Sequence, residues 1–196
     1  MKKIGLTGGI GSGKSTIGRV FKALGIAVYN SDKEAKFLIQ TDNNIKDSLI
    51  SIFGDEVFLK EEYNKEFISQ QVFDDKEKLR QLNSVVHPAV QKHFDNWCEL
   101  QRSNGSPYLI KEAAILFESG AYQGLNKTVT VNAPEALRTT RVMNRDGFNF
   151  TEIKKIMNHQ LTDSERSSRA DYVIDNSGNK LVTPQVIALD NIFRKS

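Results

Sequence analysis

The residues most suited to chemistry lie near the amino terminus, where positions 8–15 read Gly-Gly-Ile-Gly-Ser-Gly-Lys-Ser. This segment satisfies the pattern G-x-x-x-x-G-K-[ST], whose backbone N–H groups cradle phosphate oxygens. Lys14 would reach the β and γ phosphates, Ser15 would offer its hydroxyl to Mg²⁺, and Thr16 would hydrogen-bond the α phosphate. The motif therefore predicts a nucleoside triphosphate site formed by Gly11, Ser12, Gly13, Lys14, Ser15 and Thr16.

The motif stands where its mechanism requires, between a strand-like run at residues 3–7 and a helical pattern that starts near Ile17 and stops at Gly25. A chance glycine-rich turn is the simplest alternative. A dinucleotide site would need G-x-G-x-x-G, which fails because Thr16 and Lys14 occupy the third glycine position in the two possible registers. A triphosphate is favoured over NAD.

Two acids follow predicted strands and could share the motif's edge of the sheet. Asp32 comes just after the run at residues 26–29, and could accept a proton from an attacking hydroxyl or help to hold Mg²⁺ through water. Its alternative interpretation is the N-cap of a helix over residues 33–40. Glu112 follows the run at residues 108–111 and could be a second acid in the same crevice, or simply a solvated charge at a strand end.

Three arginines recur at helical spacing in the segment that starts at Pro134. Arg138, Arg141 and Arg145 are three and four residues apart, so they share one helix face. A solvated basic face is the simpler interpretation. Beside a phosphate loop, the same spacing also suits a mobile lid whose arginines neutralise the phosphate that is being transferred.

Strand-like and helical segments alternate along much of the chain. Further buried runs at residues 108–111, 128–131 and 172–174 bring the expected total to five parallel strands, and helices are expected from Pro134 and from Thr183-Pro184. Residues 41–106 show mainly helical patterns, including residues 76–85 and 90–101. We expect a doubly wound α/β fold with a helical insertion.

Composition sets the broad class. The chain has 196 residues, a net charge of +3 and 39% hydrophobic residues, which suits a globular protein and does not call for nucleic acid as a partner. No apolar run is long enough for a membrane span, and glycines interrupt any signal-peptide core after Lys3. Cys98 is the only cysteine, so we expect no cysteine zinc cluster and a reducing, cytoplasmic location. It lies in the helical segment 90–101 with Phe94 and Trp97 at core spacing, so we expect a packed thiol.

Taken together, the motifs resemble the dephospho-coenzyme A kinase family nearly end to end. The segments that carry the resemblance are residues 5–15, Asp32, His87-Pro88, residues 116–118, Arg145-Asp146, Gln160 and residues 170–176. The resemblance implies a P-loop kinase fold and transfer of the ATP γ phosphate to the 3′-hydroxyl of the dephospho-coenzyme A ribose, with ATP as co-substrate and Mg²⁺. Its partner would be the small-molecule substrate dephospho-coenzyme A. We further expect no nucleic-acid or membrane partner and a monomer or weak homo-oligomer.

The same resemblance assigns roles to single residues. Asp32 would contact the acceptor ribose and act as base, and His87 would shape the acceptor site; its simpler interpretation is a histidine ahead of a helix that starts at Pro88. Arg145 would be the lid arginine on phosphate, with Arg138 in support, and Asn176 would lie near adenine. The family usually has an aspartate at the position of Glu112. Glu112 would contact the substrate in its place, with a side chain that is one methylene longer.

A second departure from the family concerns the lid. Ile156 stands where the family tends to carry an arginine, and Lys154 or Lys155 could supply the missing charge. We expect a core of residues 1–32, 107–137 and 161–196, an acceptor-binding insertion at about 33–106 and a lid at about 138–160.

Two other functions remain open from the residues. One is a nucleotide or nucleoside kinase with a different acceptor. The other is a GTP-binding switch, which usually needs N-K-x-D after a strand, whereas Asn126-Lys127-Thr128-Val129 lacks the acid. A scaffold protein would leave the phosphate loop unexplained.

Overall fold

The structure is a computed structural model that describes residues 1–73 and 75–195. Its described part divides into two compact units, Met1–Asn30 with Gln101–Ser196, and Ser31–Leu100. The first unit contains a sheet whose five strands are all parallel, in the order β2-β5-β1-β6-β7. The strands are β1 (Lys2–Thr7), β2 (Ala27–Asn30), β5 (Tyr108–Glu112), β6 (Lys127–Asn132) and β7 (Tyr172–Asp175). The predicted α/β class and five-stranded parallel sheet are confirmed.

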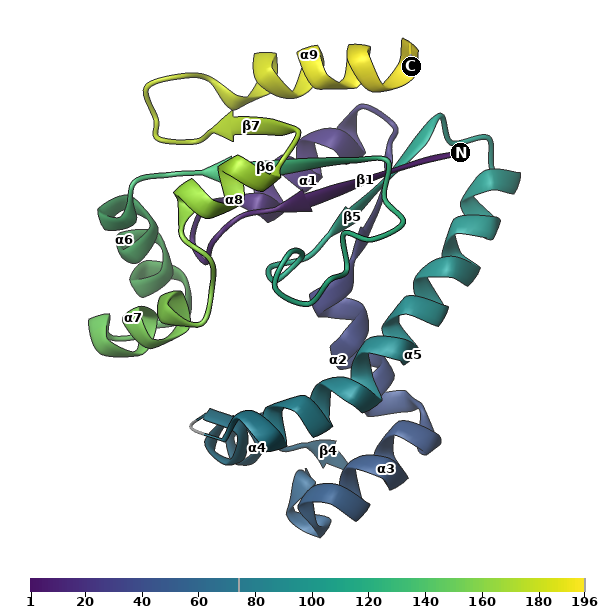
Figure 1. The fold of residues 1–196 in the computed structure, drawn as a ribbon, viewed down its shortest axis with the longest axis vertical. Coiled ribbons are helices and arrows are strands. Elements are labelled where there is room, and N and C mark those ends of the chain that lie inside the picture. Colours follow the sequence, from purple (N-terminus) through teal and green to yellow (C-terminus); the bar gives the residue numbers. More distant parts are fainter. Residues whose placement is uncertain (74, 196) are drawn as a thin grey trace. The chain divides into compact units, whose positions relative to one another are not determined.

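Helices α1 (Lys14–Ala23) and α9 (Val182–Lys195) cover one face of this sheet (Figure 1). Ile4 and Leu6 of β1 point toward them and pack in the core with Phe21 of α1 and Phe193 of α9. Gly5 lies between them in β1 and faces the other side, where a Cβ would meet Leu116 at 2.7 Å. Both faces of the central strand are therefore covered, which is why its buried residues Ile4, Gly5 and Leu6 are apolar in succession rather than alternating with polar ones.

The remaining helices of this unit follow β6 in the chain. They are α6 (Glu135–Asp146), α7 (Phe150–Asn158) and α8 (Asp163–Arg169). The α6 helix begins one residue later than expected, with Pro134 as its N-cap residue. Gly147 ends it in a left-handed conformation at φ 73°.

The second unit is mostly helical. It contains α2 (Ser31–Thr41), α3 (Asn43–Phe53), η1 (Asp55–Val57), β3 (Phe58–Leu59), β4 (Glu62–Tyr63), α4 (Lys65–Phe73) and all but the end of α5 (Lys76–Ser103). Cys98 is buried on α5, as expected for a packed thiol. None of the helices within residues 1–73 and 75–195 has the length and hydropathy that a membrane span needs.

Three local expectations for this unit are wrong. Residues 76–103 form one helix with Pro88 inside it, because a single missing N–H donor interrupts the hydrogen-bond ladder without ending it. Asp32 lies within the first turn of α2 rather than at its N-cap. The β3–β4 hairpin was not expected, because Lys60 and Glu61 occupy its turn with φ values of 51° and 66°, where glycine or asparagine is usual.

Candidate active site

The phosphate loop lies between β1 and α1, as its sequence predicts. Gly13 caps α1 in a left-handed conformation at φ 96°, and its carbonyl accepts hydrogen bonds from the N–H groups of Thr16 and Ile17. Gly11 has φ 75°, and a Cβ there would overlap the backbone carbonyl of Arg138. Only glycine combines these conformations with so close an approach. Lys14, Ser15 and Thr16 then form the first turn of α1, whose N-terminus favours anions.

Ser15 and Glu112 meet at the carboxyl end of the sheet. The Ser15 hydroxyl donates a hydrogen bond of 2.7 Å to Oε1 of Glu112, the last residue of β5. Glu112 is buried, so its interpretation as a solvated strand-end charge is wrong. Gly18 on α1 makes room for the carboxylate, since a Cβ there would lie 3.0 Å from Oε2.

Asn176 and Arg141 support the loop through its backbone carbonyls. The Asn176 side-chain amide donates to the Ser12 carbonyl at 2.7 Å, and a Cβ at Gly13 would overlap that amide. Arg141 donates to the carbonyls of Gly11 at 3.4 Å and Asn176 at 3.1 Å. Both side chains hold the loop's shape, which is a structural role that the sequence did not indicate for either residue.

The face that carries the three arginines of α6 is not uniformly solvated. Arg138 is buried, with 9% of its side chain exposed, and forms an ion pair of 3.7 Å with Asp163. Arg145 is 63% exposed and donates instead to its neighbour Asp146, at 2.8 and 2.7 Å. This structure therefore brings Arg138 to the loop and leaves Arg145 paired at the end of the helix. Lys154 forms an ion pair with Glu135, so it joins α7 to α6.

Arg166, which the sequence analysis did not single out, is the second buried arginine at the loop. It projects from α8, with 1% of its side chain exposed, and donates to the Asp163 carboxylate and the Leu161 carbonyl. A Cβ at Gly9 would overlap Arg138 and would lie 2.7 Å from the Arg166 guanidinium. The helix α8 has only seven residues, too few for a periodic signal, so this contact of Arg166 could be found only in three dimensions.

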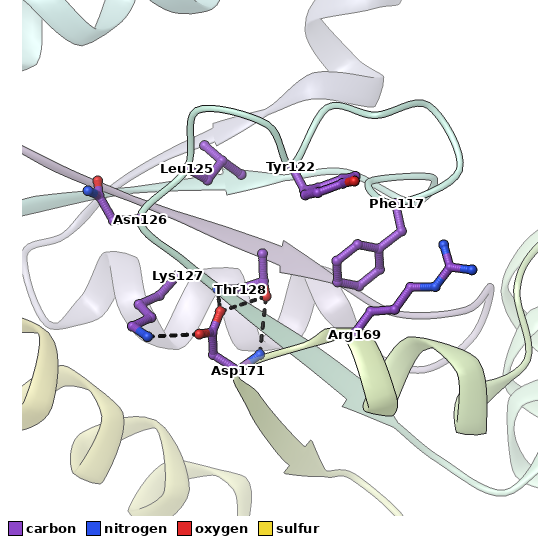
Figure 2. A pocket seen from close by; sticks show the side chains of 8 residues that line it. All are labelled: Phe117, Tyr122, Leu125, Asn126, Lys127, Thr128, Arg169 and Asp171. Atoms are coloured by element: carbon purple, nitrogen blue, oxygen red, sulfur yellow. Dashed lines mark hydrogen bonds and ion pairs between the residues drawn. The ribbon is translucent and has the colours of Figure 1, made fainter.

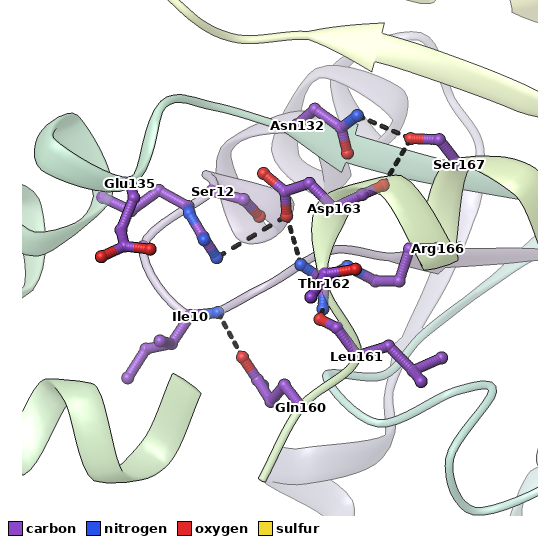
Figure 3. Close-up of polar contacts among 12 residues, drawn as sticks. Ile10, Ser12, Asn132, Glu135, Gln160, Leu161, Thr162, Asp163, Arg166 and Ser167 are labelled. Carbon is purple, nitrogen blue, oxygen red and sulfur yellow. Dashed lines mark hydrogen bonds and ion pairs between the residues drawn. The ribbon is translucent and has the colours of Figure 1, made fainter. Parts of the chain in front are cut away.

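The segment before α8 is attached to the loop and to the rest of the unit. Gln160 accepts a hydrogen bond of 2.9 Å from the Ile10 N–H (Figure 3). The Leu161 N–H donates to Glu118 at 2.9 Å. Asn132, at the end of β6, donates to Ser167 at 2.7 Å. These contacts bring the start of α8 against the phosphate loop.

A second polar cluster lies at the amino ends of β6 and β7. The Asp171 carboxylate accepts hydrogen bonds from Lys127, from the Thr128 N–H and from the Thr128 hydroxyl at 2.8 to 2.9 Å. Burial raises the pKa of Asp171, but these hydrogen bonds outweigh it and hold that pKa below its ordinary value. Figure 2 shows this cluster beside Phe117 and Tyr122, in a pocket of about 330 Å³.

Asp32 and His87 belong to the other unit. Asp32 is exposed and lies two residues after the end of β2, and His87 is partly buried on α5. Because Pro88 does not start a helix, the simpler interpretation of His87 as a residue before a helix is wrong. The roles expected for Asp32 and His87 at the acceptor stay predictions.

Comparison with known proteins supplies the family. The sequence pattern described as dephospho-CoA kinase matches residues 2–181. The chain belongs to the dephospho-CoA kinase family. A dephospho-CoA kinase of Bacteroides fragilis is 36% identical over 187 residues, which cover 95% of this chain and 90% of that protein. The predicted family, the predicted dephospho-CoA kinase function and the predicted class of ATP-dependent phosphotransferase are confirmed.

Solved structures agree on the fold. The crystal structure of TT1252 from Thermus thermophilus aligns with a TM-score of 0.84 and 31% identity, covering 99% of this chain and 97% of that one. A dephospho-CoA kinase from Campylobacter jejuni aligns at 0.63 with 19% identity, over 100% of this chain and 98% of that one. The P-loop kinase fold predicted from the sequence is confirmed.

Proposed function

We propose that the carboxyl end of the sheet catalyses transfer of the ATP γ phosphate to the 3′-hydroxyl of the dephospho-coenzyme A ribose. The observation that carries this proposal is the phosphate loop, which has a buried acid hydrogen-bonded to Ser15 on one side and buried arginines against Gly9 on the other. Such an edge supplies the positive field and oriented donors that a triphosphate needs.

The loop and its neighbours would hold the nucleotide. Backbone N–H groups of residues 11–13 and the N-terminus of α1 would bind the phosphates, with Lys14 on the β and γ groups and Thr16 on the α group. Arg138 would neutralise charge on the group in transfer. Arg145 would join only after its bond to Asp146 opens, and Asn176 would lie beside the adenine while it holds the loop.

Ser15 and Glu112 fit a magnesium ion. The hydroxyl and the carboxylate are hard oxygen donors that already lie 2.7 Å apart. Mg²⁺ usually takes only one or two protein ligands and fills its other positions with water and substrate phosphates. When bound, the ion would neutralise charge on the phosphate oxygens. The Ser15 hydroxyl would coordinate the magnesium ion directly. The Glu112 carboxylate would accept a hydrogen bond from a water molecule on the ion or from the acceptor.

The acceptor would be bound by the Ser31–Leu100 unit, with His87 shaping its site. Asp32 would take the proton of the ribose 3′-hydroxyl as that oxygen bonds to the γ phosphorus. The bond between the γ phosphorus and the bridging oxygen then breaks, and ADP leaves. One phosphoryl group is transferred and one proton reaches Asp32, so the step is balanced.

The test is ADP release from MgATP with dephospho-coenzyme A, AMP, adenosine or no acceptor, in parallel. Stimulation by dephospho-coenzyme A alone, with coenzyme A as the product, is expected. Stimulation by AMP or adenosine instead would contradict the acceptor and leave the phosphate loop's role intact.

We also propose a cytoplasmic location and a monomer or weak homo-oligomer. The location is supported by the buried Cys98, a lone thiol that suits a reducing compartment. Sedimentation of the purified protein at micromolar concentrations would measure its oligomeric state; a single tight higher oligomer would contradict the expectation.

A further inference from the structure

The buried cluster of Arg138, Arg166 and Asp163 has an unequal number of charges. The ion pairs of both guanidiniums go to the one carboxylate of Asp163. Both arginine side chains are more than nine-tenths buried, whereas the Asp163 side chain is 29% exposed. A buried positive charge without its own counter-ion is costly, so the cluster is suited to receive a further anion.

The two guanidiniums also have hydrogen-bond donors to spare. The Nε atoms of Arg138 and Arg166 are buried, and neither has a partner within residues 1–73 and 75–195. An arginine carries five N–H donors, and leaving buried donors without acceptors costs free energy. Both guanidiniums lie against Gly9, on the loop that is proposed to hold phosphate. A phosphate group there would supply both the charge and the acceptors.

We propose that Arg166 is a second phosphate-binding arginine beside Arg138, and that Asp163 is the positioning residue that holds both guanidiniums against Gly9. The Asp163 carboxylate is their shared acceptor and so sets the distance between them. The planar fork of an arginine suits paired phosphate oxygens better than a lysine does. This inference rests on the proposed binding of the triphosphate at the loop.

The Asp163 carboxylate is not what caps its helix. Thr162 caps α8 in a capping box with Glu165, and Ser167 binds the Asp163 backbone carbonyl at 2.7 Å (Figure 3). Removing the charge of Asp163 therefore leaves the cap of α8 in place. Replacing Glu165 by glutamine removes a charge from the same turn, keeps a side chain that can form the capping box and leaves the arginine pair its acceptor. Glu165 is thus a matched control on the same helix.

The experiment measures MgATP binding without acceptor, by calorimetry, for wild type and for the variants Asp163→Asn, Asp163→Glu, Arg166→Lys and Glu165→Gln. Asp163→Asn and Arg166→Lys are expected to raise the dissociation constant about tenfold, as the loss of a charge-assisted hydrogen bond would. Asp163→Glu should restore part of the affinity. Glu165→Gln removes a charge from the same turn but keeps a side chain that can form the capping box, so it should change the dissociation constant less than about twofold.

Steady-state kinetics separate positioning from a structural role. Asp163→Asn should raise KM for ATP and leave KM for dephospho-coenzyme A unchanged. If Asp163→Asn and Arg166→Lys bind MgATP as wild type does, the inference is overturned and the proposed function stands. If Asp163→Asn does not fold, Arg166→Lys, which keeps the positive charge, is the deciding variant. Wild-type MgATP binding in Arg166→Lys then overturns the inference. Failure of wild type to bind MgATP would instead overturn the proposed function.

Discussion

The two ends of strands β6 and β7 carry polar clusters of opposite design. At the amino end, Asp171 is matched by one cation, Lys127, and its carboxylate also accepts two hydrogen bonds from Thr128. At the carboxyl end, Arg138 and Arg166 share a single acid, and buried Nε donors are left over. The helix α8 joins the two, since it begins at Asp163 and ends at Arg169, two residues before Asp171.

This difference in charge balance distinguishes a cluster that stabilises the fold from one that is suited to bind an anionic ligand. The Asp171 cluster is complete without any other molecule, and its net charge is zero. The Asp163 cluster has one positive charge more than negative charges, so an anion is needed to balance it. Its two guanidiniums lie against Gly9, just after the end of β1. In parallel sheets ligands bind beyond the carboxyl ends of the strands, so the unbalanced cluster is at the edge where chemistry is expected.

The largest effect is expected at Lys14 of the phosphate loop, and Lys127 of the Asp171 cluster serves as its comparison. Lys14→Met should lower turnover about a thousandfold, because it removes a fixed charge from the transferring phosphate. Lys127→Met should leave turnover within about twofold of wild type and lower only stability. Both are measured by ADP release with dephospho-coenzyme A; a loss of turnover in Lys127→Met as great as in Lys14→Met would abolish the distinction.

Asp32→Asn extends the test to the acceptor. Loss of a general base typically costs a hundredfold or more, so we expect turnover to fall by about that factor. MgATP binding should change little, since the proposed contacts of Asp32 are with the ribose. Wild-type turnover in this variant would remove Asp32 from the mechanism.

Glu112→Gln tests the acid beside Ser15. We expect the magnesium concentration for half-maximal turnover to rise about tenfold, because an amide oxygen binds the hydrated ion less strongly than a carboxylate does. Turnover is titrated with Mg²⁺ at fixed ATP, and Ser15→Ala should shift the same midpoint. An unchanged midpoint in both variants would argue against a magnesium role for this pair.

The smallest effect is expected at the balanced cluster. Asp171→Asn should lower the free energy of unfolding by about 1 kcal/mol and leave turnover unchanged. The folded-state pKa of Asp171 is lowered, so the stability it contributes is present above the ordinary value near 3.8 and is lost as pH falls toward the folded-state pKa. Urea unfolding of wild type and Asp171→Asn should therefore differ equally at pH 7 and pH 5, and converge below about pH 4.

Local patterns predicted the elements that position the site, but not every residue in it. The buried runs became the strands, and the phosphate loop lies between β1 and α1 because its glycines carry the conformations that this turn needs. The strand order was beyond the sequence: β5 lies between β1 and β2 and so brings Glu112 to Ser15. Pairing over such distances leaves no local signature.

The partners of the arginines could not be predicted from local sequence patterns either. Spacing predicted that Arg138, Arg141 and Arg145 share a helix face, but not that each would find a different partner, in Asp163, the loop carbonyls and Asp146. Arg166 gave no signal, because its importance comes from burial against Gly9 rather than from a motif.

We propose that the triphosphate binds at the end of the strands where Arg138 and Arg166 share one acid. Proton–nitrogen correlation NMR during a titration with MgATP locates the bound nucleotide. We expect shifts at the amides of residues 9–16 and at the Nε–H groups of Arg138 and Arg166, with the amides of Lys127, Thr128 and Asp171 unmoved. Shifts confined to that second group, with the loop unchanged, would contradict it.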